Sequence, residues 1–111
     1  MRVAIRATLS RDPRLVVRGE APDASAGVDL ARALQPDAVI LDHLLPGDEL
    51  GLAAAPQFKN AAPGCKVLLF SVLDLQGSAR RAAGVDAFVN KGEWRLLLPF
   101  VERLVGLPRT P

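Results

Sequence analysis

Three polar side chains follow short apolar runs of this sequence. Asp42 comes directly after the first run, Ser71 directly after the second, and Lys91 follows the third after one intervening residue. In an open parallel sheet, side chains at the carboxyl ends of the strands meet in one crevice. A carboxylate nucleophile beside an ammonium and a hydroxyl, which neutralise and hydrogen-bond phosphoryl oxygens, forms a phosphoryl-accepting site. The trio therefore predicts such a site, although each residue alone is typical of a turn or of the surface.

The apolar runs themselves indicate strands. Each is too short for a helix and is continuous rather than alternating, which is typical of strands buried on both faces of a parallel sheet. These three runs are residues 38–41, 67–70 and 87–89. A further short run, residues 15–17, is predicted as an additional strand.

Segments of helical length lie between these strands and predict an α/β fold, with an open parallel sheet and helices on both faces. The predicted helices are residues 24–34, 49–60, 76–83 and 93–105. Pro36 closes the first of them. Pro56 predicts a kink or a late start in the second, and Pro99 predicts a bend in the last. Trp94 is expected to anchor the last helix against the sheet.

The length and composition indicate one domain. A chain of 111 residues, 50% apolar and 23% charged, is too short for a multidomain enzyme. We expect a domain over residues 1–106 and a frayed tail over 107–111. No apolar stretch approaches the roughly 20 residues that a membrane span needs, and no signal sequence opens the chain. The single cysteine, Cys65, cannot form an internal disulfide. We therefore expect a cytoplasmic protein with no membrane partner.

The charge balance gives little information about partners. The formal net charge is +2, and the arginines near the start are interleaved with core-type residues. No groove-reading motif accompanies them, so we interpret them as a solvated face and do not expect nucleic-acid binding. No general acid or complete metal site accompanies Asp42, so the chain is not expected to be an enzyme.

The sequence resembles the receiver domain of bacterial two-component response regulators. The similarity covers roughly residues 2–105 and is greatest to the subgroup that is fused to a helix-turn-helix output domain. The phrases that carry it include QPDAVILD at 35–42, VLLFS at 67–71, AGVDAFV at 83–89 and NKG at 90–92. The resemblance implies a flavodoxin-like fold.

The resemblance also implies roles for individual residues. Asp42 matches the phosphoacceptor, Ser71 the hydroxyl that follows the phosphoryl group, and Lys91 their charge partner. Leu44 matches the residue whose backbone carbonyl binds a divalent cation together with Asp42. Phe88 matches the aromatic switch of the family, and its other interpretation is an ordinary core residue.

The start of the chain departs from the family pattern. The family begins with a strand that ends in two acidic residues, and this element cannot be found here, so the chain resembles a receiver domain truncated at its N-terminus. Residues 1–10 are predicted to form a helix with one apolar face. The rival assignment places a strand at residues 2–6. That strand is followed by Ala7 and Thr8 rather than two acids, and about eight residues then remain before Leu15, whereas a parallel crossover needs about a dozen or more.

Both assignments remove the acidic pair, so the expected affinity for Mg²⁺ is weak or absent. The missing strand also leaves backbone groups without partners. Rearrangement, a homodimer, or an incomplete reading frame would account for this gap.

The function implied by the resemblance is that of a phosphorelay receiver. A histidine kinase would phosphorylate Asp42, and a downstream protein would receive the signal. The alternative is a degenerate pseudo-receiver that binds a protein partner without phosphorylation.

Overall fold

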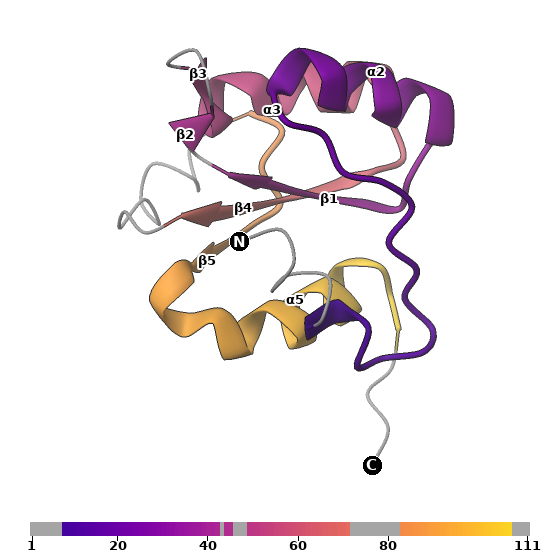
Figure 1. Ribbon diagram of the computed structural model, residues 1–111, viewed down its shortest axis with the longest axis vertical. Coiled ribbons are helices and arrows are strands. Elements are labelled where there is room, and N and C mark those ends of the chain that lie inside the picture. Colours follow the sequence, from indigo (N-terminus) through magenta and orange to yellow (C-terminus); the bar gives the residue numbers. More distant parts are fainter. Residues whose placement is uncertain (1–7, 43, 46–48, 72–82, 108–111) are drawn as a thin grey trace.

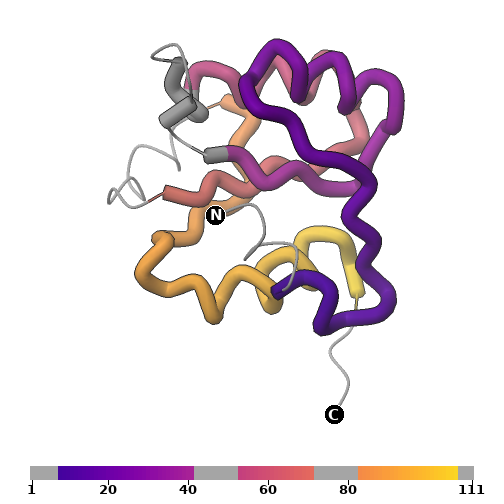
Figure 2. Tube along the Cα trace, viewed as in Figure 1, coloured from indigo at the N-terminus to yellow at the C-terminus, as the bar shows by residue number. Residues whose placement is uncertain are grey.

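A computed structural model describes residues 8–42, 44–45, 49–71 and 83–107 of the chain. Its elements in chain order are α2 (Ala24–Leu34), β1 (Ala38–Asp42), β2 (Leu44–Leu45), β3 (Glu49–Leu50), α3 (Gly51–Ala61), β4 (Lys66–Ser71), β5 (Ala87–Asn90), the 3-10 helix η1 (Lys91–Leu96) and α5 (Leu97–Leu104). Figures 1 and 2 show three layers, with α2 and α3 on one side of a sheet and α5 on the other.

The sheet is parallel and has the strand order β1-β4-β5. Its strands extend the three predicted runs by one residue or two, because the flanking polar residues continue the ladder. The prediction of a parallel arrangement is confirmed for all three strands, whereas full burial holds for β4, of which five of the six residues are buried, and β1 and β5 are mostly half-buried. The open parallel sheet with helices on both faces confirms the predicted flavodoxin-like fold class.

Alternate residues of each strand face opposite helical layers. On β4, Val67 and Leu69 belong to the cluster formed with α2 and α3, whereas Leu68 and Phe70 belong to the cluster formed with α5. A strand changes face at every residue, so a continuous apolar run fills both layers. The core therefore lies on both sides of one central strand.

Helix α2 has the bounds that the sequence predicts. Asp23 caps its N-terminus by accepting a hydrogen bond from the Ala26 N–H at 2.9 Å. At its other end Gln35 adopts a left-handed conformation with φ of 47°. The Gln35 side chain donates to the carbonyls of Arg32 and Ala61, and so joins the C-terminal ends of α2 and α3. Capping and a left-handed stop explain why the helix ends before Pro36.

The two proline-containing helices begin later than the apolar pattern alone suggests. Helix α3 starts at Gly51, after β3, two residues later than the predicted start, but Pro56 still lies inside the helix, so the start does not avoid the proline. The predicted helix over 93–105 is wrong in its first turns, where η1 occupies Lys91–Leu96 and Glu93 has non-helical angles. Helix α5 begins at Leu97, so Pro99 falls in its first turn, where the missing N–H has no intrahelical partner to lose.

The predicted strand at residues 15–17 is wrong. The segment forms no ladder with any described strand, although Leu15 and Val17 pack against the cluster on the α5 side. The predicted helix over 76–83 lies outside the described residues except for Ala83. Of the predicted helix over 1–10 the structure describes residues 8–10, and Thr8 and Leu9 are helical. Residues 108–111 of the predicted tail also lie outside the described part.

An ion-pair network ties the segment before residue 15 to α5. The buried carboxylate of Asp12 accepts hydrogen bonds from the backbone and the guanidinium of Arg14, whose Nη2 lies 2.8 Å from Asp12 Oδ2 and 3.6 Å from Glu102 Oε2. The hydrogen bonds from Arg14 hold the pKa of Asp12 well below its usual range. Asp12 therefore stays ionised and holds Arg14, whose guanidinium reaches Glu102 on α5.

Candidate site at the carboxyl edge of the sheet

The sheet register brings three candidate residues to one edge. Asp42 is the last residue of β1 and pairs in register with Phe70, and Ser71 is the last residue of β4 and pairs with Asn90. Lys91 follows Asn90 directly. Adjacent parallel strands lie about 4.8 Å apart, so the backbones of all three residues emerge at one end of three neighbouring strands.

Lys91 is positioned by the start of η1. The side chain of Asn90 caps this helix by accepting a hydrogen bond from the Gly92 N–H at 2.8 Å. The half-buried Lys91 places its Nζ 5.8 Å from the centroid of the Phe70 ring, within the range of a cation–π contact. The ammonium group therefore lies over the strand that separates Lys91 from Asp42.

Ser71 is buried at the same edge, with 2% of its surface exposed. Because it ends β4, the central strand, it lies between the strand that carries Asp42 and the strand that precedes Lys91. Asn90 and Phe70 were not among the predicted site residues. An asparagine followed two residues later by a glycine is a local signal that could have indicated the cap.

Phe88 and Leu44 lie on different elements. Phe88 is partly buried and packs against the cluster formed with α2 and α3. Leu44 lies in β2, where its backbone pairs in register with Leu50 of β3. In Figure 1 this short hairpin follows the carboxyl end of β1.

The described side chains do not form a cluster of metal ligands. Among them no three His, Cys, Asp or Glu residues group closely enough to hold a metal ion. Mg²⁺ in proteins is typically held by one or two carboxylates with waters and phosphate oxygens. The donor set expected for Mg²⁺, Asp42 and the Leu44 carbonyl, contains one carboxylate, which is the minimum.

A second polar cluster, which the sequence did not predict, lies at the opposite edge of the sheet, where β4 and β5 begin. Lys59 on α3 donates to the carbonyl of Cys65 at 2.7 Å and to Asp86 Oδ2 at 2.6 Å, and Asp86 also accepts the Val67 N–H at 2.8 Å. Burial alone would raise the pKa of Asp86, but these hydrogen bonds and the neighbouring lysine charges outweigh it and lower that pKa. The cluster fixes the start of β5 against β4, and therefore the register that carries Lys91.

Cys65 is buried and packs in the core between the sheet and the α2 and α3 side. Burial raises the pKa of its thiol, so the thiolate form is disfavoured. Within the described part of the chain, no helix is long and apolar enough to cross a membrane.

Comparison with solved structures gives close overall similarity to response regulators. The chain superposes on the signal receiver domain of a NarL-type response regulator from Mycobacterium tuberculosis with a TM-score of 0.83 and 28% identity, covering 95% of this chain and 86% of the other. A two-component response regulator of the LuxR family from Aurantimonas gives a TM-score of 0.81 and 27% identity, covering 98% and 80%.

Curated proteins with similar sequences include response regulators and methylesterases. The nitrate/nitrite response regulator NarL of Escherichia coli K12 is 31% identical over 93 residues, which are 82% of this chain and 43% of NarL. A protein-glutamate methylesterase/protein-glutamine glutaminase of Geobacter sulfurreducens is 36% identical over 87 residues, 78% of this chain and 24% of that protein. No family profile matches the chain.

These similarities, together with the parallel sheet, define the class of protein. The chain belongs to the receiver domains of two-component response regulators. It spans less than half of the length of the curated relatives that it matches. The matched part of the methylesterases is their receiver region, so the activity in their name does not follow from the match.

Proposed function

We propose that this chain is a phosphoacceptor in a phosphorelay, with Asp42 receiving a phosphoryl group from a histidine kinase. The observation that supports this most directly is the register of the sheet, which ends β1 at Asp42, ends β4 at Ser71 and starts η1 at Lys91. The kinase, a downstream protein that receives the signal, and a cytoplasmic location are parts of the same proposal.

Each residue of the trio has a distinct task. A carboxylate oxygen of Asp42 attacks the phosphorus atom, the bond from phosphorus to the donor nitrogen breaks, and an acyl phosphate forms on Asp42. The Lys91 ammonium offsets the negative charge of the phosphoryl oxygens, and the Ser71 hydroxyl donates a hydrogen bond to one of them. Phe88 packs against the core cluster on the α3 side of the sheet. A shift of its ring on phosphorylation of Asp42 would therefore alter the packing on that side. The chain accepts the group and turns over no substrate, so it is not proposed as an enzyme.

Mg²⁺ would lower the charge of the incoming phosphoryl group, and Asp42 with the Leu44 carbonyl would hold it. One carboxylate binds this ion weakly, so we expect millimolar rather than micromolar Mg²⁺ to be needed.

Incubation of the chain with acetyl phosphate and Mg²⁺, followed by intact-mass measurement, tests the proposal. A phosphoryl adduct that is lost in Asp42→Asn supports phosphotransfer to Asp42. Absence of any adduct in a folded protein supports the alternative, a pseudo-receiver that binds its partner without phosphorylation. An adduct that persists in Asp42→Asn would place the acceptor elsewhere.

A further inference from the structure

Phe70 is an aromatic residue at the candidate edge of the sheet. It precedes Ser71 in the central strand β4, and it pairs in register with Asp42 of β1 and with Val89 of β5. Lys91 follows Val89 by two residues, and its Nζ lies 5.8 Å from the centroid of the Phe70 ring. Phe70 therefore stands in the row of the sheet that separates the proposed phosphoacceptor from the strand leading to the lysine.

Packing on the α5 side holds the Phe70 ring. Only 2% of the surface of Phe70 is exposed. The ring belongs to the buried cluster that includes Leu68, Val89, Leu97 and Val101. Side chains in such a cluster interdigitate and occupy rotamer minima. The ring face is therefore a fixed surface against which a flexible side chain can settle.

The backbone of Asn90 brings Lys91 to the same side of the sheet as this ring. Val89 and Phe70 share the α5-side cluster, and side chains of a strand alternate between its two faces. Asn90 is extended, with φ of −74° and ψ of 138°, so the alternation continues to the residue after β5. Lys91 therefore follows Val89 onto the α5 side, where its ammonium meets the Phe70 ring.

A contact of this kind suits a lysine that must meet an anion. The face of an aromatic ring carries negative charge density and attracts an ammonium group within about 6 Å. The ring bears no net charge, so it restrains the ammonium without neutralising it as a carboxylate would. The four-carbon stem of lysine is flexible, and restricting it beforehand reduces the entropy that is lost when an anion binds.

We propose that Phe70 is a positioning residue for phosphoryl transfer, whose ring holds the Lys91 ammonium at the carboxyl edge of the sheet before the phosphoryl group arrives. This inference rests on the proposed function, in which Lys91 offsets the charge of the phosphoryl oxygens. Phe70 acts through Lys91 and takes no part in making or breaking bonds. An ordinary core phenylalanine would instead affect the stability of the fold and leave the transfer rate independent of the charge distribution of the ring.

Replacement of Phe70 by phenylalanines that carry one, two or three ring fluorines tests the proposal in the full chain. Fluorine withdraws electron density from the ring face and changes the volume of the ring little. We expect the rate constant for phosphorylation by acetyl phosphate at fixed Mg²⁺ to fall with each fluorine, reaching about 2- to 5-fold below wild type, which is the size of a partly exposed cation–π contact. The Tm should change little. A rate constant that does not depend on fluorination overturns the positioning role.

The same series in a Lys91→Ala background separates positioning from a structural effect. Without the ammonium group the ring has no cation to hold, so the slower rate constant of this variant should not depend on fluorination at Phe70. A dependence of equal size in both backgrounds overturns the proposal.

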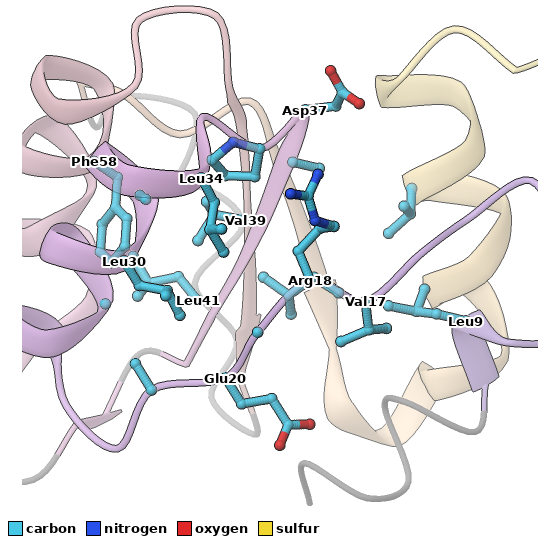
Figure 3. A pocket seen from close by; sticks show the side chains of 18 of the residues that line it. Leu9, Val17, Arg18, Glu20, Leu30, Leu34, Asp37, Val39, Leu41 and Phe58 are labelled. Carbon is cyan, nitrogen blue, oxygen red and sulfur yellow. The ribbon is translucent and has the colours of Figure 1, made fainter.

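Fluorination of Phe58 is the matched control. Phe58 and Phe70 are both buried, and both line a cavity of about 760 Å³ beside β1. Phe58 belongs to the cluster formed with α2 and α3, and Figure 3 shows it on that side of β1, away from α5. Fluorine at Phe58 should leave the rate constant unchanged. A decrease equal to that at Phe70 would show a general effect on the fold and overturns the proposal.

Ring-current shifts observe the contact without phosphorylation. Protons above the face of a ring resonate upfield, so the ε-methylene protons of Lys91 should resonate upfield of those of Lys66, which is exposed at the other edge of the sheet. Phe70→Leu, which keeps an apolar side chain, should remove this difference. Absence of the upfield shift in the wild-type chain overturns the proposal.

Failure of this proposal differs from failure of the proposed function. Absence of any adduct in the folded wild-type chain overturns the proposed function, and the positioning role is overturned with it. An adduct that forms equally fast with every fluorinated Phe70 leaves the proposed function in place and overturns the positioning role alone.

Discussion

Lys59 Nζ and Asp86 Oδ2 lie 2.6 Å apart, although 27 positions separate the two residues in the chain. The same carboxylate accepts the Val67 N–H, so one side chain joins α3, β4 and the turn before β5. Both partners of this ion pair are about a quarter exposed. A charge-assisted pair that is this well enclosed contributes more to stability than a pair on the open surface does.

Asp86→Asn should lower the free energy of unfolding by about 1.5–3 kcal/mol at pH 7, because it removes hydrogen bonds to a charged group. The folded state lowers the pKa of Asp86, so its contribution is complete above the unfolded pKa of about 3.9 and is lost as the pH falls through the lower folded value. Urea unfolding at pH 7 and at pH 2–3 should show the difference between wild type and variant shrinking in acid. Asp29→Asn, at an exposed pair with Arg32, is the control and should change stability by less than about 0.5 kcal/mol.

Gly84→Ala should destabilise the fold by about 1–3 kcal/mol or more. Gly84 has φ of +84°, and an added Cβ would lie 3.1 Å from backbone atoms of Ala55 and Pro56. Gly106 has φ of +78° with open space around it. Gly106→Ala therefore measures the free-energy cost of a positive φ at alanine without a steric clash. Gly64, where a Cβ meets nothing within 4 Å, should tolerate alanine with a gain of about 0.4–1 kcal/mol. Thermal unfolding should give the lowest Tm for Gly84→Ala, a higher Tm for Gly106→Ala and the highest for Gly64→Ala. Equal decreases in Tm for the Gly84 and Gly106 variants would show that the close approach of Gly84 to α3 does not affect stability.

Gln35→Ala should destabilise the protein by about 1–3 kcal/mol, because it removes two side-chain hydrogen bonds and keeps a non-glycine residue at positive φ. Gln35→Gly loses the same bonds but relieves the left-handed backbone, so it should be about 1 kcal/mol more stable than the alanine variant. Chemical denaturation of both variants checks this order. An alanine variant as stable as wild type would show that the hydrogen bonds of the Gln35 side chain do not contribute to the free energy of unfolding.

Lys91→Ala should slow phosphorylation of the chain by acetyl phosphate at least about tenfold, because it removes the cation proposed to stabilise the phosphoryl oxygens. Lys66→Ala is the matched control, since Lys66 begins β4 at the opposite, amino edge of the sheet. Intact-mass time courses measure the rate, and circular dichroism reports whether the fold is retained. Equal rates in the two variants would remove Lys91 from the site.

Local patterns in the sequence determined the strands of the sheet, the bounds of α2 and the edge at which the site residues meet. Continuous apolar runs predicted the three parallel strands, and the spacing of small residues with Pro36 predicted the bounds of α2, because periodicity and helix stops are properties of neighbouring residues. The positions of Asp42, Ser71 and Lys91 after those runs predicted a shared edge, since parallel strands all point the same way.

Only the tertiary structure decided which segments and side chains contact one another. Residues 15–17 have the composition of a strand but no described ladder, because a strand needs a neighbour that composition cannot supply. Trp94 was predicted to anchor the last helix, yet it is 45% exposed, because the chain begins that turn as η1. The pairing of Lys59 with Asp86 likewise depends on a contact between distant segments, which local sequence does not encode.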